Sequence, residues 1–214
     1  MKVGILGTGN VGMTLGKGFA DIGYDVMMGS RDPKQAKVQT WVKATGAHAS
    51  AGTFAEAAAF GDLAVLCTLW TGTESAIKLA DPKNLAGKVV IDTTNPLVFK
   101  QGAPPSLSVG HTDSAGEQVQ RWLPQSYVVK AFNIVGNQDM VNPDFPGGPP
   151  DMFFCGNDAK AKEAVTDILK KFGWKVVDIG GIEGARLLEP LCILWVTYGA
   201  RTGGWRHALK MLKK

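Results

Sequence analysis

Residues 7–12 read Gly-Thr-Gly-Asn-Val-Gly, so glycines occupy the first, third and sixth positions of a short turn. An apolar segment typical of a buried parallel strand, residues 3–6, precedes the turn, and a helical pattern over residues 11–22 follows it. In this context the first glycine permits a tight turn, the second lets the backbone approach a pyrophosphate, and the third lets the helix pack on the strand. The helix start adds free N–H groups and a positive dipole. The turn therefore predicts dinucleotide binding, the alternative being glycines that serve turn geometry alone.

The second predicted strand, residues 24–28, is followed by Gly29-Ser30-Arg31. An NAD-preferring site usually has Asp or Glu there, about 20 residues beyond the glycines, to bind the ribose hydroxyls. A carboxylate would repel a 2′-phosphate, whereas a serine hydroxyl and a guanidinium would hydrogen-bond it. Two nearby lysines add positive charge: Lys34 and Lys37. The sequence favours NADPH over NADH; in the alternative, Arg31 is solvated and Asp32, which also suits the N-cap of a helix starting at Pro33, binds the ribose.

Strand-like and helical segments alternate along most of the chain. Strands are expected at 3–6, 24–28, 47–50, 63–69, 89–92, 127–132, 152–154 and 175–179, and helices at 11–22, from Asp32-Pro33 onward, and at 53–60, 74–79, 116–122 and 159–172. This alternation predicts an α/β fold with a doubly wound, mostly parallel sheet, the Rossmann NAD(P)-binding fold, as a single domain over residues 1–214 with a short C-terminal strand–helix extension. Residues 99–112 and 136–150 are expected to be irregular, either as lids or as solvated connectors. Beyond residue 182 the pattern is helical to the end, with a kink or boundary at Pro190 and a break at Gly203-Gly204.

Composition excludes several classes of protein. Hydrophobic residues make up 45% of the 214 residues and charged residues 20%, which indicates a globular chain with a sizeable core. A net charge of +4, without a Lys/Arg block outside the short tail, argues against nucleic acid as a partner, and no apolar run approaches a membrane span. Cys67, Cys155 and Cys192 are widely spaced in apolar surroundings, which predicts buried thiols in a reducing cytoplasm and no CxxC metal site.

Groups that move protons are not evident at catalytic spacing. Tyr127 and Lys130 are three residues apart in a predicted strand, so they face opposite sides, and the three histidines have no zinc-binding spacing. Hydride exchange between a nicotinamide and a flavin-type ring needs orientation and little proton machinery. After a Rossmann unit of roughly 150 residues, only about 60 remain, too few for a separate helical substrate domain unless a dimer partner completes the pocket.

Five motifs in order resemble one family over nearly the whole chain. They are Gly7 to Gly12, Gly29-Ser30-Arg31, Asp92-Thr93-Thr94-Asn95-Pro96, Val129-Lys130-Ala131-Phe132-Asn133, and Gly156-Asn157-Asp158 before a helix leading to Asp178-Ile179-Gly180. Together they resemble the NADPH-dependent reductases of coenzyme F420, and equally the cytosolic oxidoreductase domain of the STEAP metalloreductases. The resemblance implies a single-domain, often dimeric, Rossmann protein that passes hydride from NADPH to coenzyme F420 or to a flavin such as FMN or FAD, a small-molecule redox acceptor stacked on the nicotinamide.

The resemblance also implies the residues that bind these rings. The pyrophosphate would be held by Gly7, Thr8, Gly9, Asn10, Val11 and Gly12, and the 2′-phosphate by Ser30 and Arg31, with Lys34 nearby. Thr68, Leu69 and Trp70 would cover the cofactor after the fourth strand, Asn95-Pro96 would end the fifth, and Asn133 would face the reacting rings. The archaeal F420 enzymes tend to have histidine where this chain has Asn133.

The apolar terminal helix admits two interpretations: burial against the sheet, or a homodimer interface that helps to complete the pocket. Glu183, Arg186 and Glu189 recur every three residues, which favours a solvated helix face with one salt bridge. Trp70 and Trp195 are candidates either for the core or for walling a flat ring. Two other functions stay open: reduction of a small carbonyl or imine, which Tyr198 or His207 in the cleft would favour, and NADPH sensing without turnover.

Overall fold

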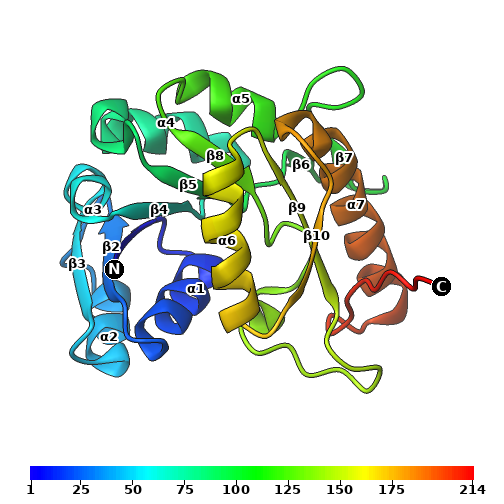
Figure 1. The fold of residues 1–214 in the computed structure, drawn as a ribbon, viewed down its shortest axis with the longest axis horizontal. Coiled ribbons are helices and arrows are strands. Elements are labelled where there is room, and N and C mark those ends of the chain that lie inside the picture. The colour runs from blue at the N-terminus through cyan, green and yellow to red at the C-terminus, as the bar shows by residue number, and fades with distance from the viewer.

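The computed structural model describes residues 1–214 and contains an eight-stranded sheet in the order β10-β9-β8-β5-β4-β1-β2-β3 (Figure 1). Its strands are β1 (Lys2–Leu6), β2 (Asp25–Ser30), β3 (Ala49–Thr53), β4 (Leu63–Leu66), β5 (Val89–Asp92), β8 (Tyr127–Lys130), β9 (Asp151–Gly156) and β10 (Lys175–Asp178). All neighbouring strands are parallel except β8 and β9, which are antiparallel. The predicted doubly wound, mostly parallel Rossmann sheet is confirmed.

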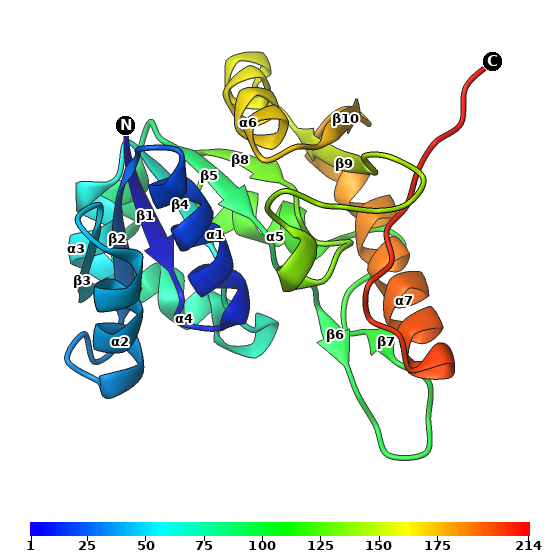
Figure 2. The same ribbon diagram turned by 90° about the horizontal axis from the view of Figure 1, so that it is seen from below.

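Helices cover both faces of this sheet (Figure 2). They are α1 (Asn10–Asp21), α2 (Ala36–Thr45), α3 (Phe54–Phe60), α4 (Trp70–Ala80), α5 (Ala115–Trp122), α6 (Ala159–Lys171) and α7 (Ala185–Thr202), with short 3-10 turns at Pro82–Leu85, Asn137–Asp139 and Ile182–Gly184. Buried side chains of α1, α2 and α6 form one core, and those of α3, α4, α5 and α7 form the other. The central strands β1, β4, β5 and β8 are largely buried, which explains why they are continuous apolar runs in the sequence. The edge strands β3 and β10 are only partly buried.

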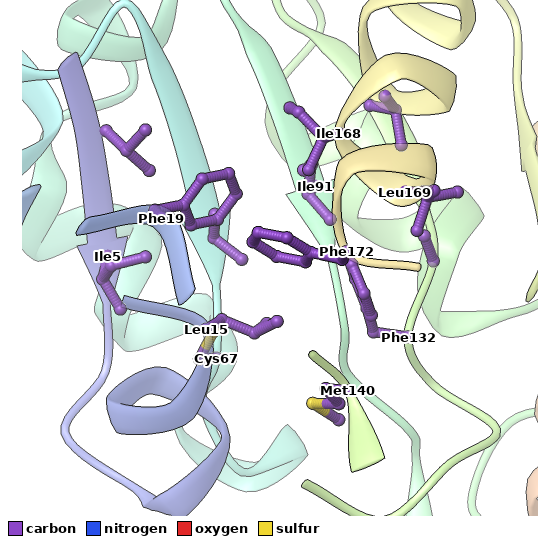
Figure 3. Close-up of a cluster of buried hydrophobic side chains, with 14 of the residues drawn as sticks. Ile5, Leu15, Phe19, Cys67, Ile91, Phe132, Met140, Ile168, Leu169 and Phe172 are labelled. Carbon is purple, nitrogen blue, oxygen red and sulfur yellow. The ribbon is translucent and has the colours of Figure 1, made fainter. Parts of the chain in front are cut away.

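An aromatic contact between α1 and the end of α6 closes the first core (Figure 3). The ring centroids of Phe19 and Phe172 are 5.0 Å apart, and Phe132 lies 6.1 Å from Phe172. All three side chains are fully buried, so replacing one by alanine would cost about 3–5 kcal/mol. This packing fixes α1, and with it the glycine turn, against the sheet.

Several element boundaries differ from the expectation. The strand predicted to reach Leu69 ends at Leu66, because the chain turns there into α4, which begins at Trp70. The Thr68 and Thr73 hydroxyls lie 2.9 Å apart, and the Thr73 hydroxyl donates to Leu69 O, which anchors the first turn of α4. The apolar residues that continue to Leu69 concealed this turn.

The helix expected from Asp32-Pro33 begins instead at Ala36, so Asp32 is not its N-cap. The Asp32 carboxylate accepts from the backbone N–H of Lys34 and forms a local turn after β2. The loop 99–112, expected to be irregular, contains β7 (Ser106–Leu107), which pairs antiparallel with β6 (Leu97–Val98). Strands of two residues are too short to give a periodic pattern.

The C-terminal segment is not helical to the end. The α7 helix passes through Pro190 without a boundary, since a proline in the second turn removes one hydrogen bond, and it ends at the left-handed Gly203. Beyond Gly203 the tail is extended and runs beside the loop 136–150: Arg206 pairs with Asp139, and Asp151 N–H donates to Leu209 O. The predicted break at Gly203-Gly204 is confirmed. None of the helices combines the length and apolar character needed to cross a membrane.

An ion-pair network joins α5 to α7. Arg186 donates two hydrogen bonds to the Glu117 carboxylate, and Arg121 pairs with Asp113 at 2.7 Å. The hydrogen bond from Arg121 lowers the pKa of Asp113 to about 2, and the hydrogen bond from Arg186 lowers the pKa of Glu117. Because both folded-state pKa values lie below the unfolded ones, this stabilisation is present above about pH 4 and is lost as the pH falls toward 2.

We therefore expect Asp113→Asn to lower the thermal midpoint by about 2 °C at pH 5, since a partly exposed pair contributes below about 1 kcal/mol. The difference from the native protein should shrink to a small part of its pH 5 value near pH 2, where about half of the native carboxyl groups are protonated. Thermal unfolding followed by circular dichroism measures both midpoints. Glu163→Gln on the exposed face of α6 is the control, and a pH-independent deficit in Asp113→Asn would contradict the assignment.

Candidate functional site

The topology gathers the predicted site residues at one edge of the sheet. Strands β8, β5, β4, β1 and β2 are neighbours in that order and are parallel to one another, so their carboxyl ends meet. These ends lead directly into the segments that the sequence singled out, which are 7–12 after β1, 30–34 after β2, 68–70 after β4, 95–96 after β5 and Asn133 after β8. Crevices at this edge of open α/β sheets are where ligands bind.

The glycine turn has the geometry that the motif predicts. Gly7 has φ +133°, and a Cβ there would lie 2.4 Å from Cys67 O; a Cβ on Gly12 would lie 2.2 Å from Gly7 O. These two glycines are required by the fold itself. A Cβ on Gly9, in contrast, would meet no atom within 4 Å. The space above Gly9 is thus open, as a backbone that approaches a ligand requires.

The start of α1 makes no hydrogen bond with a side chain. Gly9 is the N-cap residue, and the first turn contains no acidic residue. The helices α3, α5 and α6 are instead capped by the side chains of Thr53, Ser114 and Asp158. The N–H groups at the start of α1 therefore remain available to an anion, and they fit a pyrophosphate.

At the end of β2, Ser30 and Arg31 play different parts. Ser30 is buried; its hydroxyl donates to Asp32 O and accepts from the Asp32 N–H and the Gln35 amide. The serine hydroxyl thus organises the turn after β2, with its proton directed at Asp32 O. Arg31 is exposed and makes no hydrogen bond or ion pair, and Lys34 is exposed beside it. The free cationic groups at this end of the site are Arg31, Lys34 and, in the first turn of α2, Lys37.

Leu69 and Trp70, although adjacent, face different surroundings. Leu69 is 84% exposed just beyond the carboxyl end of β4, where its apolar side chain is free to contact a ligand. The Trp70 ring stacks on Trp122 of α5, with centroids 5.4 Å apart, and packs against the second core. The core interpretation of Trp70 therefore accounts for its contacts, whereas Leu69 stays available to a bound ring.

Asn95 and Asn133 hold each other across the ends of β5 and β8. The Asn95 amide donates to Asn133 O at 2.8 Å, and the Asn133 amide donates to Asn95 Oδ1 at 3.0 Å and to Leu188 O of α7 at 2.9 Å. Asn133 is 3% exposed, and its Oδ1 has no hydrogen-bond partner. Pro96 is buried next to this pair.

A buried charge cluster lies behind the asparagine pair. The Lys130 ammonium contacts Asp92 Oδ2 at 2.8 Å, Glu189 Oε1 at 3.3 Å and Thr94 O at 2.7 Å. Burial lowers the pKa of Lys130, but attraction to Asp92 and Glu189 outweighs it, and the net pKa is raised. Glu189 also accepts from the backbone N–H groups of Ala115 and Gly116 at the start of α5, whose dipole offsets the excess negative charge.

The prediction that Glu189 belongs to a solvated helix face is wrong, since this side chain is 1% exposed. Arg186 pairs with Glu117 rather than with either neighbouring glutamate, and Glu183 lies in the 3-10 turn before α7. Lys130 is the residue whose position in the sequence could have indicated that Glu189 is buried. A lysine inside an apolar strand requires buried acidic partners, and Glu189 lies in an equally apolar run.

Groups that would move a proton are engaged elsewhere. Both ring nitrogens of His207 face backbone carbonyls, Gly204 O at 3.1 Å and Trp195 O at 2.9 Å, and its ring stacks on Trp195. Tyr198 is exposed on α7. The three cysteines are free and buried, and burial raises each thiol pKa to about 12: Cys67, Cys155 and Cys192. No three His, Cys, Asp or Glu side chains form a cluster that would hold a metal ion.

Comparison with known proteins agrees with this geometry. A family model described as "NADP oxidoreductase coenzyme F420-dependent" matches residues 2–96. The F420-dependent NADP reductase of Methanocaldococcus jannaschii is 32% identical over 206 residues, covering 92% of this chain and 91% of that protein. The chain belongs to the F420-dependent NADP reductase family. The resemblance seen in the five motifs is thereby confirmed.

Two further proteins are similar to this chain, one over its full length and one over part of its own length. A crystal structure from Arthrobacter sp. FB24, described as "a putative f420 dependent nadp-reductase", has a TM-score of 0.93 and 37% identity over 100% of both chains. Metalloreductase STEAP3 of Rattus norvegicus is 28% identical over 197 residues, which cover 89% of this chain but 36% of that protein. Because the chain spans about a third of the metalloreductase, the likeness concerns one part of that protein.

Proposed function

We propose that the chain is an oxidoreductase that transfers hydride between NADPH and coenzyme F420 or a related flavin ring such as FMN or FAD. The observation that carries this proposal is the uncapped start of α1 beneath the open space at Gly9, which fits a dinucleotide pyrophosphate. Family membership supports NADP and F420 as the two substrates. NADPH supplies the hydride when it is bound, and the second ring accepts it.

In this proposal each segment of the sheet edge has a binding role. The turn 7–12 binds the pyrophosphate, and Arg31 with Lys34 binds the 2′-phosphate. Leu69 covers a ring and keeps water from it, while Asn133, supported by Asn95, orients the reacting part of the ligands. The chain thus promotes the reaction by positioning the two rings. This agrees with the contacts of Lys130 and His207, which are hydrogen-bonded to backbone carbonyls of the protein itself.

The outer face of α7 supports a homodimer. Leu187, Leu194 and Tyr198 recur along one side of the helix and are 54–66% exposed, while Leu188 and Cys192 on the other side are buried. Burying this apolar stripe against a second copy would remove it from water. Sedimentation equilibrium tests the proposal: the native chain should have twice the monomer mass, and Leu194→Glu should have the monomer mass.

The sheet and the cysteines bear on the domain organisation and the compartment of the protein. Because one sheet takes strands from residue 2 to residue 178, we propose a single domain over residues 1–214. The free, buried thiols favour a reducing compartment, the cytoplasm. The reduction of a small carbonyl or imine is less well supported, since both ring nitrogens of His207 face backbone carbonyls and Tyr198 packs edge-on against the His207 ring.

The proposal is tested anaerobically with purified protein and NADPH, by following the loss of nicotinamide absorbance in parallel with F420, FMN and FAD. We expect turnover with F420 or with the flavins. Turnover with the flavins alone would move the protein toward flavin reduction. Tight NADPH binding without turnover in any cuvette would instead support a sensing module and would contradict the enzyme.

A further inference from the structure

The orientation of the Asn133 amide is fixed by its neighbours. Asn133 O is a backbone carbonyl and can only accept, so the Asn95 amide nitrogen must face it and Asn95 Oδ1 must face Asn133. The Asn133 nitrogen then has two acceptors, Asn95 Oδ1 and Leu188 O. Both of its protons are used, and the amide cannot flip without placing oxygen against oxygen.

This arrangement leaves Asn133 Oδ1 as a buried acceptor without a donor. Buried polar atoms are nearly always paired, so an orphan at the ligand-binding edge of the sheet calls for an explanation. Asn95, which is partly exposed, lies directly beside it, so one side chain separates the atom from solvent at the carboxyl ends of the strands. A ligand that carries an N–H group could donate a hydrogen bond to this unpaired oxygen if the Asn95 side chain shifted slightly.

The Lys130 cluster holds the backbone that carries the asparagine pair. The peptide groups of Thr94 are bound on both sides: its N–H donates to Asp92 Oδ1 at 2.9 Å, and its carbonyl accepts from Lys130 at 2.7 Å. The next residue is Asn95. A Cβ on Gly116 would lie 2.9 Å from Lys130 Cε, so the lysine stem occupies space that only a glycine leaves.

We propose that Asn133 is a specificity-determining residue whose Oδ1 accepts a hydrogen bond from an amide-type N–H on the bound redox rings, and that Lys130 is the positioning residue that keeps it aimed. The inference rests on the proposed function, because it concerns the same site. Two rings carry such a group beside a carbonyl: the nicotinamide in its carboxamide, and a flavin or deazaflavin in its pyrimidine imide. Both offer the same donor chemistry.

Analogues that lack each N–H distinguish the two sources. The reduced 3-acetylpyridine analogue of NADPH carries a methyl group in place of the carboxamide NH2, and N3-methyl FMN lacks the imide N–H. Dissociation constants for the nucleotides are measured by quenching of tryptophan fluorescence without an acceptor, and KM is measured for FMN and its methyl derivative. We expect the native protein to discriminate about tenfold against one analogue, and Asn133→Ala to bring that ratio near one.

If the ratio changes for the nucleotides, the partner of Asn133 is the carboxamide; if it changes for the flavins, the partner is the second ring. Ratios that are the same in the native protein and in Asn133→Ala for both pairs would overturn the inference while leaving NADPH binding and the proposed function intact. Absence of NADPH binding to the native protein would overturn both.

The role of Lys130 is tested by the same ratio. Lys130→Met should reduce discrimination as Asn133→Ala does, Lys130→Arg should restore part of it, and binding of 2′-phospho-ADP-ribose, which lacks the nicotinamide, should not change. Gly116→Ala, whose new Cβ would lie 2.8 Å from Ala185 Cβ and 2.9 Å from Lys130 Cε, serves if Lys130→Met does not fold. Variants that lose thermal stability but keep the native ratio would show that the cluster is structural only and would overturn the positioning role.

Discussion

Replacing Arg31 with alanine should raise the dissociation constant for NADPH roughly 10–100-fold and leave that for NADH almost unchanged. A charge-assisted hydrogen bond to a 2′-phosphate contributes about 1.5–3 kcal/mol, and NADH has no phosphate there. The arginine has no partner within the chain and is exposed, so its removal should not disturb the fold. Tryptophan fluorescence titrated with each nucleotide measures both constants.

A matched control comes from the far end of α2, where Lys43 is also exposed and basic. Lys43→Ala removes the same charge at a distance from the predicted 2′-phosphate site, so it should change neither constant by more than about twofold at moderate salt. An equal loss of affinity for NADPH and NADH in Arg31→Ala would contradict the assignment of Arg31 to the 2′-phosphate.

Substituting Gly9 by alanine should weaken NADPH binding roughly 10–100-fold while the thermal midpoint stays within about 2 °C of the native value, because forcing a methyl group into a fitted contact costs about 1–3 kcal/mol. The φ and ψ of Gly9, −76° and 175°, suit any residue, and its Cβ would meet open space in the free protein. Only a bound pyrophosphate would meet the new methyl group. Calorimetric titration gives the affinity, and thermal unfolding gives the midpoint.

Alanine substitutions at two other glycines serve as controls for Gly9→Ala. Gly147→Ala, in the loop 136–150, also adds a Cβ that meets nothing and should leave both stability and binding unchanged. Gly7→Ala should damage the fold, because it combines a positive φ with a Cβ 2.4 Å from Cys67 O. Native affinity for NADPH in Gly9→Ala would mean that the pyrophosphate does not lie over this turn.

Much of the fold was predictable because two sequence patterns, the glycine turn and the apolar strand segments, depend only on residues close together in the sequence. The glycine turn with its flanking strand and helix specifies a βαβ unit, and buried parallel strands such as β5, predicted at its observed bounds, are plain apolar runs. The antiparallel pairing of β8 with β9 was not predictable, since an apolar run does not specify the direction of its neighbour. The end of β4 was missed because apolar residues continue to Leu69, through the turn.

Some features of the candidate site could likewise be predicted from local sequence, whereas others could not. Segments that follow strands, such as 7–12 and Asn133, could be placed at the sheet edge from their position in the sequence. Contacts between distant segments could not: Asn95 and Asn133 are 38 residues apart, and Lys130 reaches Glu189 across the second core. Ser30 stays a predicted phosphate ligand, and no local pattern reveals that its hydroxyl also hydrogen-bonds Gln35 and Asp32.

In the proposed reaction the protein transfers hydride directly from NADPH to a second flat ring. The most direct test is a single turnover with NADPH deuterated at C4 in either stereochemical position, with F420 and 5-deaza-FMN as acceptors, because both retain the transferred hydrogen on carbon. We predict that the reduced acceptor carries deuterium from one of the two labelled forms and none from the other. Deuterium released to solvent, or NADPH left unoxidised with both acceptors, would contradict the claim.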